Sequence, residues 1–149
     1  MADDARPVSA AQMRRVADDP GRLDLVGAPE GFDALVMADI VKARKSLAVF
    51  VARDTARLSA FTDAFRFFSQ GTEILTFPAW DCLPYDRVGP SAGVAAQRMA
   101  TLSRLAAGLE AKPTLLVTTV AALIQRVPPV RSASGRKRRA RPRIASTRA

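Results

Sequence analysis

Residues 72–86 read TEILTFPAWDCLPYD, and the rest of the chain is best interpreted outward from them. Positions 72–77 are rich in β-forming residues. The ten residues from Phe77 to Asp86 hold the only Trp, the only Tyr and the only Cys of the chain. Two prolines six positions apart exclude a helix interior and remove backbone donors. The sequence therefore predicts a strand over 72–77 followed by a rigid, irregular loop over 77–86.

The large apolar side chains of this loop admit two interpretations. A loop at the carboxyl end of a strand lies at the sheet edge where ligands and partners bind in open α/β proteins. Trp80, Leu83 and Tyr85 either cover that end of the sheet as structural side chains or contact a partner. Because the prolines reduce the entropy lost on ordering the loop, we expect it to dock on the sheet with Trp80 and Tyr85 largely buried.

Apolar runs alternate with helical patterns on both sides of this stretch. The runs 46–52 and 114–119 are continuous, as in strands covered on both faces, and 23–26 is a shorter run. Helices are predicted over 32–43, from Asp54 to about Gly71, over 91–109 and over 120–126. The expected core-facing residues are Leu35, Val36, Ile40 and Ala43, then Leu58, Phe61, Phe65 and Phe68, and then Val94, Met99, Leu102, Leu105, Ala106 and Leu109. This alternation predicts the α/β class, with an open parallel sheet of about four strands and helical crossovers.

The net charge of +9 is unevenly distributed over the 149 residues. Residues 130–149 carry eight of the 23 Lys and Arg and no acid, so the preceding part is nearly neutral against its 14 acids. Three segments are predicted: a helical appendage over 1–21, an α/β subdomain over 22–129 and a disordered basic tail over 130–149. The tail composition also suggests a truncated or frameshifted product. One Cys, no His and no long apolar run predict a cytoplasmic protein without disulfide, metal site or membrane span.

The turn after the first predicted strand invites comparison with a phosphate-binding P-loop. Gly27 and Gly31 flank a Gly-rich turn, but Asp33 stands where the pattern G-x-x-x-x-G-K-[ST] requires Lys. Carboxylates at a helix N-terminus repel phosphate. We therefore expect a degenerate P-loop that binds no nucleotide, and no cofactor is predicted. No catalytic constellation is found elsewhere, because Cys82 has no His to pair with.

Three further stretches carry recognisable sequence: Gly27-x-Pro-Glu-Gly31, Arg98-Met-Ala-Thr-Leu102 and Val117-Thr-Thr-Val-x-Ala-Leu123. Together with the loop from Phe77 to Pro90, they resemble the amino-terminal end of bacterial transcription-repair coupling factor (Mfd), over roughly residues 22–129. The resemblance implies a UvrB-like module whose first piece is a degenerate RecA-like α/β subdomain. The residues that carry it, in structural or interface roles, are Trp80, Leu83, Pro84, Tyr85, Asp86 and Arg98.

The resemblance implies a whole protein that is an ATP-dependent DNA translocase, displaces stalled RNA polymerase and recruits UvrA. Its motor and UvrA-binding parts have no counterpart in this sequence, so RNA polymerase, UvrA and DNA are expected as partners only through those parts. This chain is therefore predicted to be no enzyme but a non-catalytic scaffold that contacts the other subdomains of a coupling factor. The alternative is a small nucleic-acid-binding protein that uses residues 130–149 as a polybasic arm, with weak, non-specific affinity.

Overall fold

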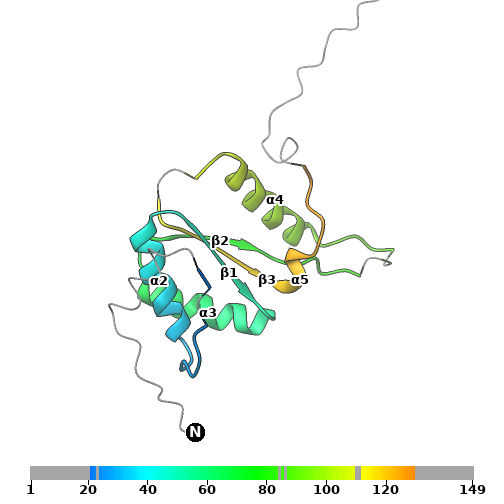
Figure 1. Ribbon diagram of the computed structural model, residues 1–149. Helices are drawn as coiled ribbons and strands as arrows, with labels where there is room; N and C mark the ends of the chain where they lie inside the picture. The colour runs from blue at the N-terminus through cyan, green and yellow to red at the C-terminus, as the bar shows by residue number, and fades with distance from the viewer. Residues whose placement is uncertain (1–20, 23, 84, 86, 110–111, 130–149) are drawn as a thin grey trace, which may run out of the picture.

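Helices and strands alternate along the chain as predicted (Figure 1). The fold is that of a computed structural model, which describes residues 21–22, 24–83, 85, 87–109 and 112–129. The elements are α2 (Phe32–Arg44), β1 (Leu47–Ala52), α3 (Thr55–Phe68), β2 (Glu73–Phe77), α4 (Ala92–Ala106), β3 (Thr114–Thr119) and α5 (Val120–Leu123). The predicted appendage and tail lie outside the described residues.

The three strands form one parallel sheet in the order β1-β3-β2. Thr114 of the central strand pairs with Leu47 on one side and with Glu73 on the other. The open parallel α/β class is thereby confirmed, but the described part of the sheet has three strands and not about four. Asp24 to Val26 do not join it, and Val26 is 84% exposed, whereas Leu23 is outside the described residues. A run this short, interrupted by a charge and ended by Gly27, has little apolar surface to bury.

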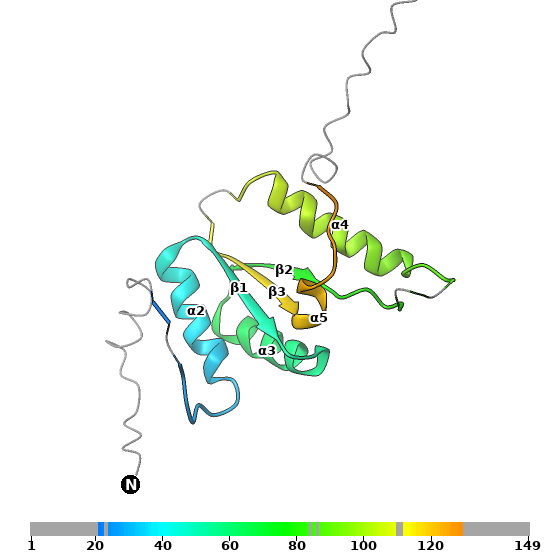
Figure 2. The same ribbon diagram turned by 45° about the vertical axis from the view of Figure 1, so that its right-hand side comes forward.

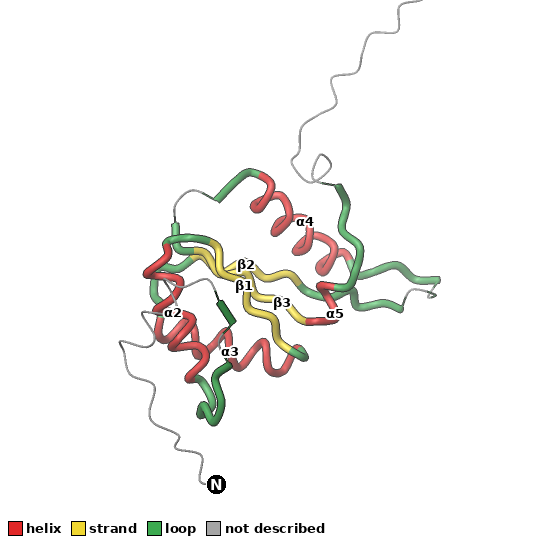
Figure 3. Tube along the Cα trace, viewed as in Figure 1, coloured by secondary structure: helices red, strands yellow, loops and turns green. Residues whose placement is uncertain are grey.

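Helices cover the two faces of the sheet unequally. α2 and α3 pack on one face, and α4 packs on the other against β2 (Figures 1 and 2). The tube in Figure 3 shows the three strands lying between these helix layers. This arrangement follows from right-handed crossovers, because the chain moves from β1 outward to β2 and then returns to the centre as β3. No helix among the described residues is long and apolar enough to cross a bilayer.

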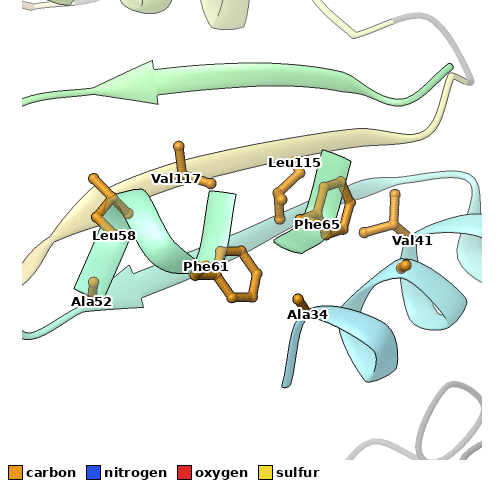
Figure 4. Packing of buried hydrophobic residues seen from close by; sticks show 9 residues of the cluster. Ala34, Val41, Ala52, Leu58, Phe61, Phe65, Leu115 and Val117 are labelled. Atoms are coloured by element: carbon orange, nitrogen blue, oxygen red, sulfur yellow. The ribbon is translucent and has the colours of Figure 1, made fainter. Parts of the chain in front are cut away.

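The main core lies between the sheet and the α2–α3 layer. Phe61 and Phe65 of α3 are fully buried, and Phe65 lies beside Leu115 of β3 (Figure 4), whereas Phe61 stacks on Phe50 of β1. The predicted stripe of α3 is confirmed, and Phe67, which falls off that stripe, is 78% exposed. Asp54 caps the helix as predicted, because its carboxylate accepts a hydrogen bond from the backbone N–H of Arg57.

The buried face of α2 differs from the prediction. The helix buries Ala34, Val36, Ala38 and Val41, whereas of the four predicted residues only Val36 is fully buried and Ala43 is exposed. Alanines at this surface let the α2 backbone approach α3 closely, so small residues occupy the centre of the contact. Hydrophobic spacing alone favours the larger side chains and therefore places the stripe incorrectly.

The buried face of α4 is polar at its centre, which is a second correction. Arg98 and Thr101 are its buried residues, whereas Met99, predicted to face the core, is 38% exposed. The hydroxyl of Thr101 donates to the carbonyl of Thr76 at 2.6 Å, which satisfies it at the sheet edge. The helix ends at Ala106, shortly before Gly108 with its φ of 87° and before the predicted end at residue 109. The last helix, α5, is also shorter than the predicted 120–126.

Candidate interaction site at the carboxyl edge of the sheet

The aromatic loop starts where β2 ends, at the carboxyl edge of the sheet. Phe77 is buried at this point, and Trp80, three residues later, is half-buried. The backbone N–H of Trp80 donates to the side-chain oxygen of Gln125 at 2.8 Å. Since Gln125 follows α5, this bond joins the base of the loop to the segment after β3.

Arg98 of α4 packs under the base of the loop and is only 1% exposed. The Cζ atom of its guanidinium lies 4.1 Å from the centroid of the Phe77 ring and 4.2 Å from that of the Trp80 ring. Its Nη1 donates to the carbonyl of Pro78 at 2.6 Å and to the side-chain oxygen of Gln125 at 3.2 Å. We call Arg98, Phe77, Trp80 and Gln125, with the Pro78 carbonyl, the arginine clamp.

The charge of Arg98 is held without a carboxylate partner among the described residues. Burial lowers the pKa of the guanidinium from its ordinary value. Nη2 of Arg98 is buried without a hydrogen-bond partner in the described part of the chain. The aromatic ring faces and the Pro78 carbonyl therefore provide the compensation, and each cation–π contact contributes on the order of 1–2 kcal/mol when desolvated. The clamp ties the loop base to both α4 and the end of β3.

A second hydrogen bond joins the aromatic loop to the start of α4. Asp81 accepts a hydrogen bond from the backbone N–H of Ser91 at 3.0 Å, and Ser91 in turn caps α4 by accepting from the N–H of Val94. Hydrogen bonds from Ser91 hold the pKa of the Asp81 carboxyl below its ordinary value. The two ends of the segment between Asp81 and Ser91 are therefore pinned together, and the residues between them form a projecting tip.

The loop tip is exposed, which corrects the prediction for Tyr85. Tyr85 is 96% exposed, Leu83 is 70% exposed and Val88 is 77% exposed. Figure 2 shows the connection between β2 and α4 extending away from the sheet. The two interpretations of this loop thus apply to different parts of it: Trp80 packs at the base, whereas the described tip residues are largely exposed. Pro84 and Asp86 lie outside the described residues.

The degenerate P-loop turn lies at the same edge of the sheet but on the α2–α3 side. Gly27 and Gly31 adopt positive φ angles of 70° and 84°, and Gly31 is the N-cap of α2. The side chain of Asp33 accepts from the backbone N–H of Ala34 at 2.9 Å and pairs with Arg57 in the first turn of α3. A hollow of about 480 Å³ opens beside this pair, lined by Leu25, Ala28, Pro29, Glu30, Asp33 and Arg57. An internal carboxylate therefore holds the cation that a bound phosphate would need.

Two residues of these sites were not singled out by sequence. Gln125 is an ordinary polar residue in a predicted helix, and only the folded loop brings it to Trp80. Arg57 lies 24 positions from Asp33, and no local pattern links them. The structure joins Trp80 and Arg98 in one cluster, but it places Leu83 and Tyr85 at the loop tip and Gly27, Gly31 and Asp33 in a separate turn.

Comparison with known proteins gives one consistent result. The transcription-repair-coupling factor of Rickettsia prowazekii is 38% identical over 63 residues, which cover 42% of this chain and 5% of that protein. The factor of Rickettsia typhi is 34% identical over 79 residues, or 53% of this chain and 7% of that protein. The chain resembles part of a transcription-repair-coupling factor. That of Rickettsia conorii agrees, at 35% identity over 63 residues, 42% of this chain and 6% of the relative.

These matches confirm the resemblance inferred from the sequence motifs. No protein-family model matches the chain. The chain spans between 5% and 7% of the length of the coupling factors it matches. The degenerate RecA-like character of the subdomain and the division at residues 22 and 129 stay predictions.

Proposed function

We propose that this chain is a non-catalytic interaction scaffold of a transcription-repair coupling factor. The observation that carries the proposal is the loop at the carboxyl edge of the sheet, whose base is locked and whose tip is apolar and exposed. The arginine clamp and the bond between Asp81 and Ser91 hold the tip before any partner arrives. A preorganised tip loses little entropy on binding, so its exposed side chains are suited to anchor a protein partner.

The composition of the tip favours a protein partner. Tyr side chains are enriched at protein interfaces and at their hot spots, where they fill pockets on the other surface, and a neighbouring Leu adds apolar contact area. Leu83, Tyr85 and Val88 are all exposed on the connection between β2 and α4. The partner in this proposal is another domain of the coupling factor, while RNA polymerase, UvrA and DNA are reached through other parts of that protein. Residues 130–149, on which the nucleic-acid alternative rests, lie outside the described residues.

Binding to a coupling factor tests this proposal. The chain is mixed with the Rickettsia prowazekii factor from which the matching segment has been deleted, and affinity is measured by titration calorimetry. We expect saturable binding that Leu83→Ala and Tyr85→Ala each weaken about tenfold or more, the size of a hot-spot loss. Phe67→Ala is the matched control, since Phe67 is an equally exposed apolar residue on α3, away from the loop. Absence of binding, or equal loss in the control, contradicts the proposal.

The P-loop turn supports the non-catalytic part of the proposal. Asp33 neutralises Arg57, and Glu30 adds a second carboxylate to the lining of the hollow. A polyphosphate entering the hollow would meet negative charge instead of the Lys and hydroxyl that P-loops supply. ATP binding at this turn is therefore electrostatically unfavourable.

The wild-type chain is expected to show no saturable binding of a fluorescent ATP analogue below about 1 mM. Asp33→Asn removes the carboxylate that holds Arg57, so weak, salt-sensitive binding should appear in that variant. Asp63→Asn is the control, because Asp63 pairs with Arg66 on an exposed surface of α3, the helix that carries Arg57. Fluorescence anisotropy measures binding of the ATP analogue to the wild type and to both variants. Saturable wild-type binding, or a gain in the control but not in Asp33→Asn, would show that this account of the turn is wrong.

A further inference from the structure

The face of β1 that points away from α2 and α3 is apolar and partly exposed in the described part of the chain. Ala48, Phe50 and Ala52 point into the core, so the alternate residues Leu47, Val49 and Val51 lie on the α4 side of the sheet. They are 38%, 46% and 40% exposed, although continuous apolar strands of parallel sheets are normally covered on both faces. We call these three residues the β1 strip.

The strip is exposed because the two faces carry different numbers of helices. Two helices cover one face, whereas on the other face α4 packs on β2, at the opposite side of the sheet from β1 (Figure 1). A helix about 10 Å wide covers about two strands spaced about 4.8 Å apart. The part of this face over β1 therefore has room for one more helix, and its apolar side chains favour an amphipathic one.

Cations gather at the amino end of the strip. Arg44 and Lys45 lie three and two positions before Leu47, whereas Lys42 donates to the Phe68 carbonyl on the α2–α3 side of the sheet. Lys45 is the C-cap of α2 and adopts a left-handed conformation with φ 46°, and its side chain is exposed. A helix over the strip is therefore favoured when its end beside Lys45 carries carboxylates.

A segment of this chain has the required pattern. Within the appendage over 1–21, the capping-box spacing of Ser9 to Gln12 predicts a helix through about Ala17. In this helix Ala10, Met13 and Val16 recur at intervals of three and form one apolar side. Asp18 and Asp19 follow at its C-terminal end, where carboxylates are unfavourable against the helix dipole unless cations lie nearby. Nine helical residues are about 13 Å long, which matches the distance of about 13 Å from Leu47 to Val51 along a strand.

We propose that residues 9–17 dock on the β1 strip, with Asp18 and Asp19 beside Arg44 and Lys45. A helix that runs antiparallel to β1 in this way completes the second layer on the α4 face. The proposal concerns the opposite sheet face from α2 and α3 and does not depend on the loop that carries the proposed function.

Disulfide trapping in the full chain tests the docking. In a Cys82→Ser background, Val49→Cys is combined with Met13→Cys, since both residues are central and their pairing tolerates small errors in register. The control combines Met13→Cys with Phe67→Cys, an exposed position on α3. Formation of the internal disulfide under mild oxidation is followed by non-reducing electrophoresis and mass spectrometry. We expect the Val49 pair to form it at least about tenfold faster, because docking raises the effective concentration of the two thiols.

Two further variants sharpen the result. Arg15→Cys replaces Met13→Cys to place the thiol about 200° around the predicted helix, on the side opposite Met13, and trapping with Val49→Cys should then slow. Asp18→Lys with Asp19→Lys should also slow trapping of the original pair. Equal rates for the Val49 and Phe67 pairs would overturn the proposal. So would rapid covalent dimerisation of the single Val49→Cys variant, because a second copy would then cover the strip. Val51→Cys repeats the measurement if Val49→Cys does not fold.

Discussion

Phe61→Ala is expected to lower the free energy of unfolding by about 3–5 kcal/mol. Phe61 is fully buried, stacks on Phe50 of β1 and contacts Phe65 one turn along α3. Its truncation removes the transfer free energy of the ring and leaves a cavity that the close-packed α3–sheet contact cannot fill. Since a domain is stable by only about 5–15 kcal/mol in total, a large fraction of the variant should be unfolded at moderate urea concentration.

Urea denaturation followed by far-ultraviolet circular dichroism measures this loss. Phe67→Ala is the control within the same helix, because the Phe67 side chain is 78% exposed and its removal leaves no cavity. The free energy of unfolding of the control should stay within about 0.5 kcal/mol of the wild-type value. Comparable losses in the two variants would show that the core does not lie between α3 and the sheet.

Arg98→Ala is expected to lower the free energy of unfolding by about 3 kcal/mol, and Arg98→Met by about 1 kcal/mol or less. Both variants remove the donor to the Pro78 carbonyl, but only alanine leaves a void beneath Phe77 and Trp80. Methionine fills most of the void, and it also removes a buried charge that has no carboxylate partner among the described residues. The difference between the two variants separates packing from charge.

Tryptophan fluorescence reports on this site directly, because Trp80 is the only Trp in the chain. Loosening of the loop base in Arg98→Ala should shift its emission to longer wavelength and increase quenching by iodide, whereas Arg98→Met should resemble the wild type. An equal loss of stability in the two variants would mean that the charge of Arg98, and not its packing, holds the loop. Tyr85→Ala is a suitable reference, since the exposed Tyr85 side chain does not contribute to the clamp.

Local patterns in the sequence determined most of the secondary structure. The apolar runs of β1 and β3 and the stripe of α3 follow from side-chain periodicity within a few residues. Asp54 and Thr119 cap helices through bonds that span three residues, so both caps could be inferred from sequence. The prediction that the turn around Asp33 lacks P-loop chemistry likewise rests on residue identity, because Asp33 stands at the Lys position of the pattern.

Tertiary contacts decided the features that no local pattern determines. The order β1-β3-β2 depends on pairing between strands far apart in sequence, and Asp24 to Val26 remained outside the described sheet. Arg98 is buried because Phe77, Trp80 and Gln125 surround it, whereas hydrophobicity alone would leave an arginine in solvent. Tyr85 is exposed for the opposite reason: its loop is pinned at Asp81 and Ser91 beyond the edge of the sheet, where no described helix or strand lies against it. Periodicity reports which side chains favour burial, but only the three-dimensional arrangement determines which of them find a surface to cover.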